Sequence, residues 1–98
     1  MAILRRGIMW NSRFTIDVKP DVDKALAKLS KKNPNQMQII TKKIAQILDN
    51  PYHFKPLRGD LSGARRVHIG KSFVLIYGID EADNKIMILD YDHHDKIY

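Results

Sequence analysis

The chain has 98 residues, of which 44% are hydrophobic, and its formal net charge is +6. This length predicts a single domain over residues 1–98, in which residues 1–12 form an N-terminal extension. The composition excludes a disordered chain, and the lack of cysteine excludes disulfides, thiolate catalysis and cysteine-bound zinc. No apolar run approaches the ~18 residues that a membrane-spanning helix needs. Since the first residues also lack a secretory pattern, we expect a cytoplasmic protein with no membrane partner.

The positive charge is concentrated in one part of the sequence. Residues 55–77 contain five lysines and arginines but one acid, whereas residues 79–98 contain six acids and two lysines. A small basic domain of this kind typically binds a polyanion, either nucleic acid or an acidic protein. The alternative is a generally basic surface with no nucleic-acid partner.

The first half of the chain predicts one strand and two helices. Apolar and polar residues alternate over 14–19, which is typical of a half-buried strand. Apolar residues then recur at helical spacing up to about Lys31 and, after a break at Asn33-Pro34, up to Asp49. Asn33 is the expected N-cap and Pro34 the first helical residue, so the helices should form a hairpin. The two apolar stripes are Val22, Ala25, Leu26 and Leu29, then Met37, Ile40, Ile44, Ile47 and Leu48.

The second half predicts three strands over 64–69, 72–79 and 85–91, with a turn at 82–84 and a polar tail over 92–98. The element order is therefore β-α-α-β-β-β, which is an α+β fold. Short connections between the last three strands predict antiparallel pairing. We expect an antiparallel sheet with the helical hairpin packed on one face, and the other face left to solvent or substrate.

Strand 64–69 carries the most informative chemistry. Successive side chains of a strand point to opposite faces, so Arg66 and His68 share the face that the helices leave uncovered. Arginine binds phosphate through a planar fork, and histidine transfers protons near neutral pH. The alternative for His68 is an ordinary solvated histidine. Arg65 alternates onto the other side, where we expect it to reach past the sheet edge or to pair with an acid.

Several short segments occur in a fixed order along the chain: Asn50-Pro51, Lys55-Pro-Leu-Arg-Gly-Asp-Leu-Ser-Gly63, Arg66-Val-His-Ile-Gly70, Phe73-Val-Leu-Ile-Tyr77 and His93-His-Asp-Lys-Ile-Tyr98. Together they resemble the RelE/ParE superfamily of toxins from type II toxin–antitoxin systems. The resemblance covers nearly the whole chain and is closest to the RelE/YafQ-like mRNA interferases. It implies a RelE-like fold and a metal-independent endoribonuclease that cuts mRNA on the ribosome and inhibits translation.

The resemblance also implies functional residues and partners. The catalytic positions of such toxins correspond to His68, His94, Arg66 and the C-terminal aromatic Tyr98. Four further cations are expected to bind RNA, namely Lys55, Arg58, Arg65 and Lys71. The alternative for Arg58 and Lys71 is a solvated cation that raises the local positive potential. The implied partners are a cognate antitoxin protein, the ribosome and mRNA, and no cofactor is implied.

Some positions depart from the pattern of these nucleases. Lys55 replaces a loop histidine of the YafQ type, Ser72 replaces an acid, and Val74 replaces an arginine typical of RelE. Two alternative functions therefore remain open. One is a ParE-like, non-enzymatic inhibitor of DNA gyrase, and the other is a catalytically degenerate toxin that acts by binding its antitoxin.

The run Asp92-His-His-Asp95 raises the separate question of a metal site, because histidine and carboxylate are metal ligands. Neighbouring residues of an extended tail point apart, and no second ligand cluster has a recognisable spacing. We therefore expect no metal at this run, and the alternative for His94 is a polar residue of the tail.

Overall fold

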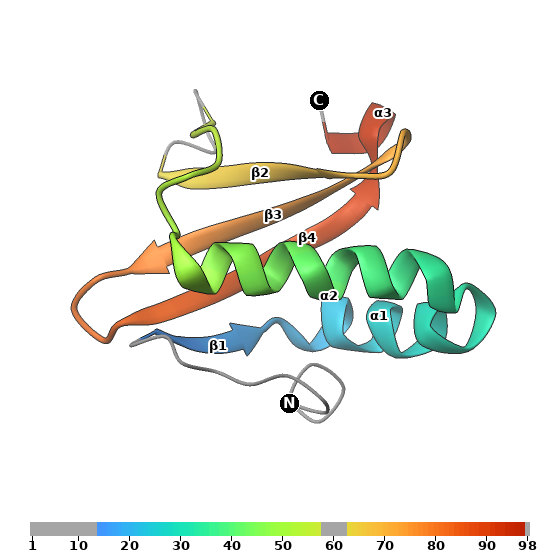
Figure 1. The fold of residues 1–98 in the computed structure, drawn as a ribbon, viewed down its shortest axis with the longest axis horizontal. Coiled ribbons are helices and arrows are strands. Elements are labelled where there is room, and N and C mark those ends of the chain that lie inside the picture. The colour runs from blue at the N-terminus through green and yellow to red at the C-terminus, as the bar shows by residue number, and fades with distance from the viewer. Residues whose placement is uncertain (1–13, 58–62, 98) are drawn as a thin grey trace.

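The computed structural model describes residues 14–57 and 63–97, with only the backbone described for 96–97. The predicted N-terminal extension therefore lies outside the described residues. The order of elements confirms the predicted β-α-α-β-β-β arrangement and adds a short helix at its end (Figure 1). The elements are β1 (Thr15–Val18), α1 (Pro20–Lys32), α2 (Pro34–Asp49), β2 (Ala64–Ile69), β3 (Phe73–Asp80), β4 (Lys85–His93) and α3 (His94–Ile97). The prediction of a polar tail over 92–98 was wrong, because β4 continues to His93 and the chain then turns into α3.

One residue joins the two long helices. The N–H of Asn33 donates to the carbonyl oxygen of Leu29 at 2.7 Å and ends α1. The side-chain oxygen of the same Asn33 accepts from the N–H of Gln36 at 3.1 Å and caps α2, which begins at Pro34. This confirms the predicted hairpin, and it explains the tight connection, since a single asparagine satisfies backbone groups of both helices.

The sheet has the strand order β1-β4-β3-β2. The pairs β2–β3 and β3–β4 are antiparallel, as predicted, but β1 runs parallel to β4. The sheet is therefore mixed. The expectation of a fully antiparallel sheet was wrong for β1, because the helical hairpin carries the chain back across the sheet before the next strand begins, and β1 pairs with the last strand.

Both helices cover the same face of the sheet, and the core lies between the two layers (Figure 1). The predicted stripe of α2 is buried throughout, whereas Ala25 in the predicted stripe of α1 is exposed. No helix within the described residues is long and apolar enough to cross a membrane. The core side chains are Phe14, Val18, Val22, Leu26, Met37, Ile40, Ile44, Ile47, Leu48, Val67, Ile69, Leu75, Tyr77, Ile86 and Ile88.

A register shift between β3 and β4 determines which side chains of β4 face the helices. Tyr77 pairs with Ile88, but the preceding Ile76 pairs with Asp90, so Leu89 is an extra residue on β4. Beyond this bulge, Tyr91 is on the helix-covered face, where its hydroxyl accepts from the amide nitrogen of Gln36 at 2.8 Å. The carboxylates after the bulge consequently point to the opposite face.

The loop after α2 covers part of the β2 edge. The N–H of Leu57 donates to the carbonyl oxygen of Ala64 at 2.8 Å, and the N–H of Arg66 donates to that of Lys55 at 3.2 Å. At the start of the loop, the buried Tyr77 hydroxyl donates to the carbonyl oxygen of Pro51 at 2.6 Å. The loop thus forms hydrogen bonds with backbone groups at the outer edge of β2 that would otherwise face solvent. The same bonds fix the backbone of Lys55 beside Arg66.

Removing the Tyr77 hydroxyl should destabilise this loop anchor. We expect Tyr77→Phe to lower the free energy of unfolding by about 1–3 kcal/mol, because the buried Pro51 carbonyl loses its partner. Burial raises the pKa of the Tyr77 hydroxyl to about 12. Its stabilisation is therefore present below the ordinary pKa of 10.0 and is lost as the pH rises towards about 12. Urea unfolding at pH 7 and at alkaline pH measures both effects. The difference between wild type and Tyr77→Phe should shrink at alkaline pH, and a constant difference would contradict this account.

Candidate active site on the face opposite the helices

The two histidines that the sequence singled out meet at one end of the sheet. His68 is exposed on β2, and His94 is exposed at the start of α3. Their ring centroids are 6.0 Å apart and their ring planes are inclined by 28°, although 26 positions separate them in the sequence. Two groups that can each hold a proton therefore lie within reach of a single small substrate group.

His94 reaches this position through a backbone contact. Its N–H donates to the carbonyl oxygen of Ser72 at 2.7 Å, which ties the start of α3 to the turn between β2 and β3. That turn requires Gly70, whose φ of 62° lies in the left-handed region. Ser72 was identified in the sequence as a departure from the nuclease pattern. In the structure its main-chain oxygen contributes to placing His94.

The cations of the site lie along the β2 side of the sheet. Arg66 shares the face of His68, two residues away, and its N–H bonds to the main chain of Lys55. Lys71 is exposed in the turn that also holds Ser72. The predicted RNA-binding residue Arg58 and the predicted catalytic Tyr98 lie outside the described residues. Arg66 and His68 thus share one face of β2, His94 stacks beside His68, and Lys55 and Lys71 lie in the loop and the turn next to this strand.

The rest of this face is not uniformly basic. Val74 pairs with His68 and Ile76 pairs with Arg66, so both lie on the same face, and both are buried. The next strand across places Asp92 beside Val74 and Asp90 beside Ile76. Positive groups therefore occupy the β2 side and carboxylates the β4 side. A phosphate is attracted to the first and repelled by the second.

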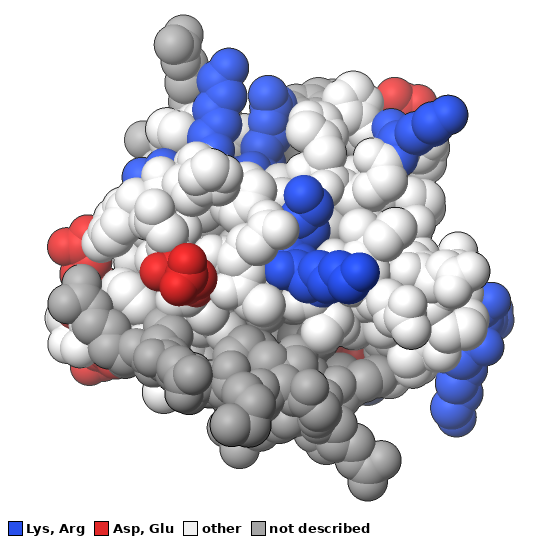
Figure 2. Space-filling view, viewed as in Figure 1, with Lys and Arg blue, Asp and Glu red and all other residues white. Residues whose placement is uncertain are grey.

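The helix-covered face has a different charge pattern. Figure 2 shows Lys and Arg side chains over α2 and along the upper edge of the view, the side on which β2 lies in Figure 1. Asp and Glu side chains lie towards the left of this view, at the end of α2 and near the turn between β3 and β4, and also at the upper right near α3. The cations of α2 lie on the side of the sheet away from the histidine pair, so they do not belong to the candidate site.

Arg65 has a structural contact that the sequence could not specify. Its guanidinium donates to the carbonyl oxygen of Phe54 at 2.7 Å and to that of Tyr52 at 3.4 Å. It also lies over the Tyr52 ring, 5.4 Å from the centroid. The predicted partner was an acid or solvent beyond the edge, but the observed partners are main-chain oxygens of the loop. RNA binding by Arg65 stays a prediction.

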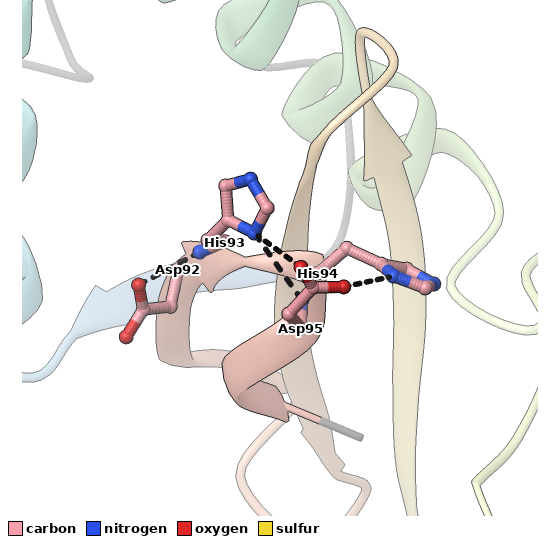
Figure 3. A network of polar contacts seen from close by, with 4 residues as sticks. All are labelled: Asp92, His93, His94 and Asp95. Carbon is pink, nitrogen blue, oxygen red and sulfur yellow. Dashed lines mark hydrogen bonds and ion pairs between the residues drawn. The ribbon is translucent and has the colours of Figure 1, made fainter.

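The polar residues at the end of β4 form a local network (Figure 3). An oxygen of Asp92 accepts from the N–H of His93 at 2.7 Å, and Nδ1 of His93 accepts from the N–H of Asp95 at 3.3 Å. The two carboxylate oxygens of Asp95 lie 3.7 Å from His93 Nδ1 and 3.6 Å from His94 Nδ1. Among the described residues, no group of three or more His, Cys, Asp or Glu side chains could hold a metal ion. Sequence analysis had considered His94 as a catalytic residue or a polar residue of the tail, and the run Asp92-His-His-Asp95 as possible metal ligands. It missed the contacts of these residues with one another.

Comparison with known proteins identifies the family of this chain. Residues 13–98 match the family described as ParE toxin of type II toxin-antitoxin system, parDE. The chain belongs to this toxin family. A protein from Methanocaldococcus jannaschii that is named as a toxin, RelE4, is 45% identical over 85 residues, which are 87% of this toxin and 90% of that protein.

Solved structures share the fold of this toxin. The YoeB/ParE toxin from Agrobacterium tumefaciens has a TM-score of 0.77 at 13% identity, with 83% of this chain and 99% of that chain covered. YafQ from E. coli has a TM-score of 0.67 at 17% identity, with 88% and 99% covered. At these identities the likeness concerns the fold, which confirms the RelE-like arrangement predicted from the sequence.

The role of Arg65 can be tested by a conservative change. We expect Arg65→Lys to lower the free energy of unfolding by about 1.5–3 kcal/mol, because an ammonium cannot reproduce a guanidinium fork between two carbonyl oxygens. Chemical denaturation measures this loss. Lys71→Ala, which removes an exposed cation, is the matched control and should leave stability unchanged within about 0.5 kcal/mol. Equal stability of wild type and Arg65→Lys would show that the loop contacts contribute little.

Proposed function

We propose that this toxin is a metal-independent endoribonuclease, an mRNA interferase, that cleaves mRNA on the ribosome and thereby inhibits translation. The observation that supports this most directly is the pair of exposed imidazoles, His68 and His94, with ring centroids 6.0 Å apart. Arg66 on the same sheet face supplies a permanent positive charge two residues from His68. A fold that served only to bind another protein would not require two proton-transfer groups beside a phosphate-binding side chain.

The proposed reaction uses the ribose 2′-hydroxyl as the nucleophile. One imidazole accepts the proton of this hydroxyl while its oxygen attacks the adjacent phosphorus. The bond from phosphorus to the 5′-oxygen breaks, and the second imidazole, in its protonated form, donates a proton to that leaving oxygen. The products are a 2′,3′-cyclic phosphate and a free 5′-hydroxyl. Proton transfers of this kind each contribute about 10²–10⁴-fold to the rate.

The remaining predicted residues fit around this reaction. Arg66 would stabilise the extra negative charge of the pentavalent phosphorus through two parallel hydrogen bonds. Lys55 is held beside Arg66 and would attract the neighbouring phosphates, together with Lys71, Arg65 and Arg58. Tyr98 would stack on a base or orient the phosphate. His94 is assigned as general acid or base, and His68 as its counterpart.

The proposed partners follow from charge and from the family. A basic protein of this size is suited to a ribosomal RNA surface, where it would act on mRNA in the cytoplasm. Since the family consists of toxins of type II systems, we also propose a cognate antitoxin protein as the physiological inhibitor.

Inhibition of DNA gyrase is the second candidate, and the family description itself favours it, because the matching family is that of ParE toxins. Val74 favours it too. Val74 replaces the arginine typical of RelE, and in the structure it is a buried apolar residue opposite His68. A degenerate toxin that only binds its antitoxin would share these features. Neither alternative requires an acid–base pair of residues. Mutation of His68 or His94 therefore distinguishes them from the nuclease.

The decisive test is expression of the toxin without an antitoxin, with mRNA cleavage mapped by primer extension. We expect growth arrest and cuts in ribosome-bound mRNA. We also expect His94→Ala or His68→Ala to slow cleavage by about 10²–10⁴-fold through loss of a proton-transfer group. His53→Ala, which removes an exposed histidine of the loop, is the matched control and should cleave like wild type.

The other outcomes favour other functions. Induction of a DNA-damage response while mRNA stays intact would contradict the nuclease function and support inhibition of DNA gyrase. Growth arrest that survives the loss of either His68 or His94 would argue against the proposed chemistry. No arrest with any variant would point to the degenerate toxin.

A further inference from the structure

We propose that His93 is a positioning residue whose imidazole caps α3 and thereby holds His94 against His68. This inference deepens the proposed function, on which its catalytic part rests. His93 is the last residue of β4, and α3 begins at the next residue. The residue before a helix is the N-cap, where a side-chain acceptor normally satisfies a free backbone N–H of the first turn.

The geometry of His93 is that of such a cap. Its Nδ1 accepts from the N–H of Asp95, the second residue of α3, at 3.3 Å. A ring nitrogen that accepts a hydrogen bond carries no proton, so the neutral form of His93 is the one that caps. Because α3 has four residues, it is too short to be stable by itself and depends on contacts at its ends.

The ring of His93 is held on the side of the sheet that the helices cover. Its centroid lies 5.4 Å from that of Phe73, edge to face, and Phe73 in turn stacks on Tyr91 at 5.3 Å. Tyr91 is fixed to α2 through Gln36. The rings of His93 and His94 point in different directions, and only His94 reaches over β2 (Figure 3). His93 therefore acts on the site through the backbone and is not a member of the imidazole pair.

Consecutive residues at this turn are each fixed by a different bond. The N–H of His93 donates to Asp92, that of His94 to Ser72, and that of Asp95 to the His93 ring. The bond to Ser72 fixes His94 on the turn between β2 and β3, and the bond to the His93 ring supports the first turn of α3 that follows. A displacement of about 1 Å at a catalytic group can reduce the rate by about 10²-fold, so fraying of α3 should be visible in catalysis.

Two variants of His93 test separately its role as a hydrogen-bond acceptor and its aromatic contact with Phe73. In His93→Asn, the side-chain oxygen occupies the place of Nδ1 and asparagine is a favourable N-cap, so the cap is kept and the ring is lost. In His93→Phe, the aromatic contact with Phe73 is kept and the acceptor is lost. Loss of a cap lowers the ratio of ordered to frayed helix by about fivefold. The direct readout is the nuclear Overhauser effect between ring protons of His68 and His94 in the isolated toxin.

We expect His93→Asn to keep this Overhauser effect and to cleave ribosome-bound mRNA within about twofold of wild type, because asparagine restores the cap. His93→Phe should weaken the effect and slow cleavage. Asp95→Asn is the control for the Asp95 carboxylate, whose oxygens lie 3.7 Å from His93 Nδ1 and 3.6 Å from His94 Nδ1. It removes the charge but keeps the backbone N–H, and should preserve the Overhauser effect.

Two results would overturn the assignment. Cleavage by His93→Asn as slow as that of His94→Ala would mean that the imidazole of His93 is itself needed for the reaction. An unchanged Overhauser effect in His93→Phe would mean that the cap does not position His94. If the Overhauser effect responds as expected but no protein cleaves mRNA, the positioning role of His93 stands and the proposed nuclease function fails. The two proposals are therefore tested separately.

Discussion

The candidate site depends on one main-chain hydrogen bond, from the N–H of His94 to the carbonyl oxygen of Ser72. This bond closes the start of α3 onto the turn between β2 and β3. Without it, His94 would follow the direction of β4, and β3 would lie between it and His68. Since neighbouring strands lie about 4.8 Å apart, that arrangement would put the imidazoles roughly 10 Å from each other. A backbone contact tolerates changes of side chain, so serine can occupy this position without loss of the geometry.

The second constraint is that the loop after α2 covers part of the outer edge of β2. β2 is the last strand in the order β1-β4-β3-β2, so half of its backbone groups point away from the sheet. The loop from α2 pairs with this edge near Ala64 and Arg66 and leaves it before His68. Arg65 holds the loop from the core-facing side, and Tyr77 holds its beginning at Pro51. The same contacts that cover the edge thus place a flexible lysine beside Arg66, which links the stability of the loop to the charge of the site.

Much of this could be predicted from the sequence because the relevant signals are local. Alternation of apolar residues located the strands, and Asn33-Pro34 located the junction of the helices. The period of two along β2 placed Arg66 and His68 on one face. What the sequence could not give were contacts between distant segments. The parallel pairing of β1 depends on the path of the whole chain, and the partners of Arg65 are backbone atoms that leave no signal in side-chain patterns. The extension of β4 and the start of α3 were missed because the deciding feature is a histidine acting as a cap, and histidine is not a usual residue there.

The distribution of charge over the open face favours one orientation of a bound polyanion. Lys55, Arg66 and Lys71 follow β2, while Asp90 and Asp92 follow β4 on the same face. Between them lie the buried Val74 and Ile76, which offer no polar group. A phosphodiester chain has a more favourable electrostatic energy along β2, where the cations attract its phosphates. It has a less favourable energy towards β4, where the carboxylates of Asp90 and Asp92 repel them. The two imidazoles lie at the end of that favourable path. Asp90 and Asp92 therefore restrict where on this face a phosphate can lie and favour the edge at which His68 and His94 meet, whereas Asp95, 3.6 Å from His94 Nδ1, lies at that edge itself.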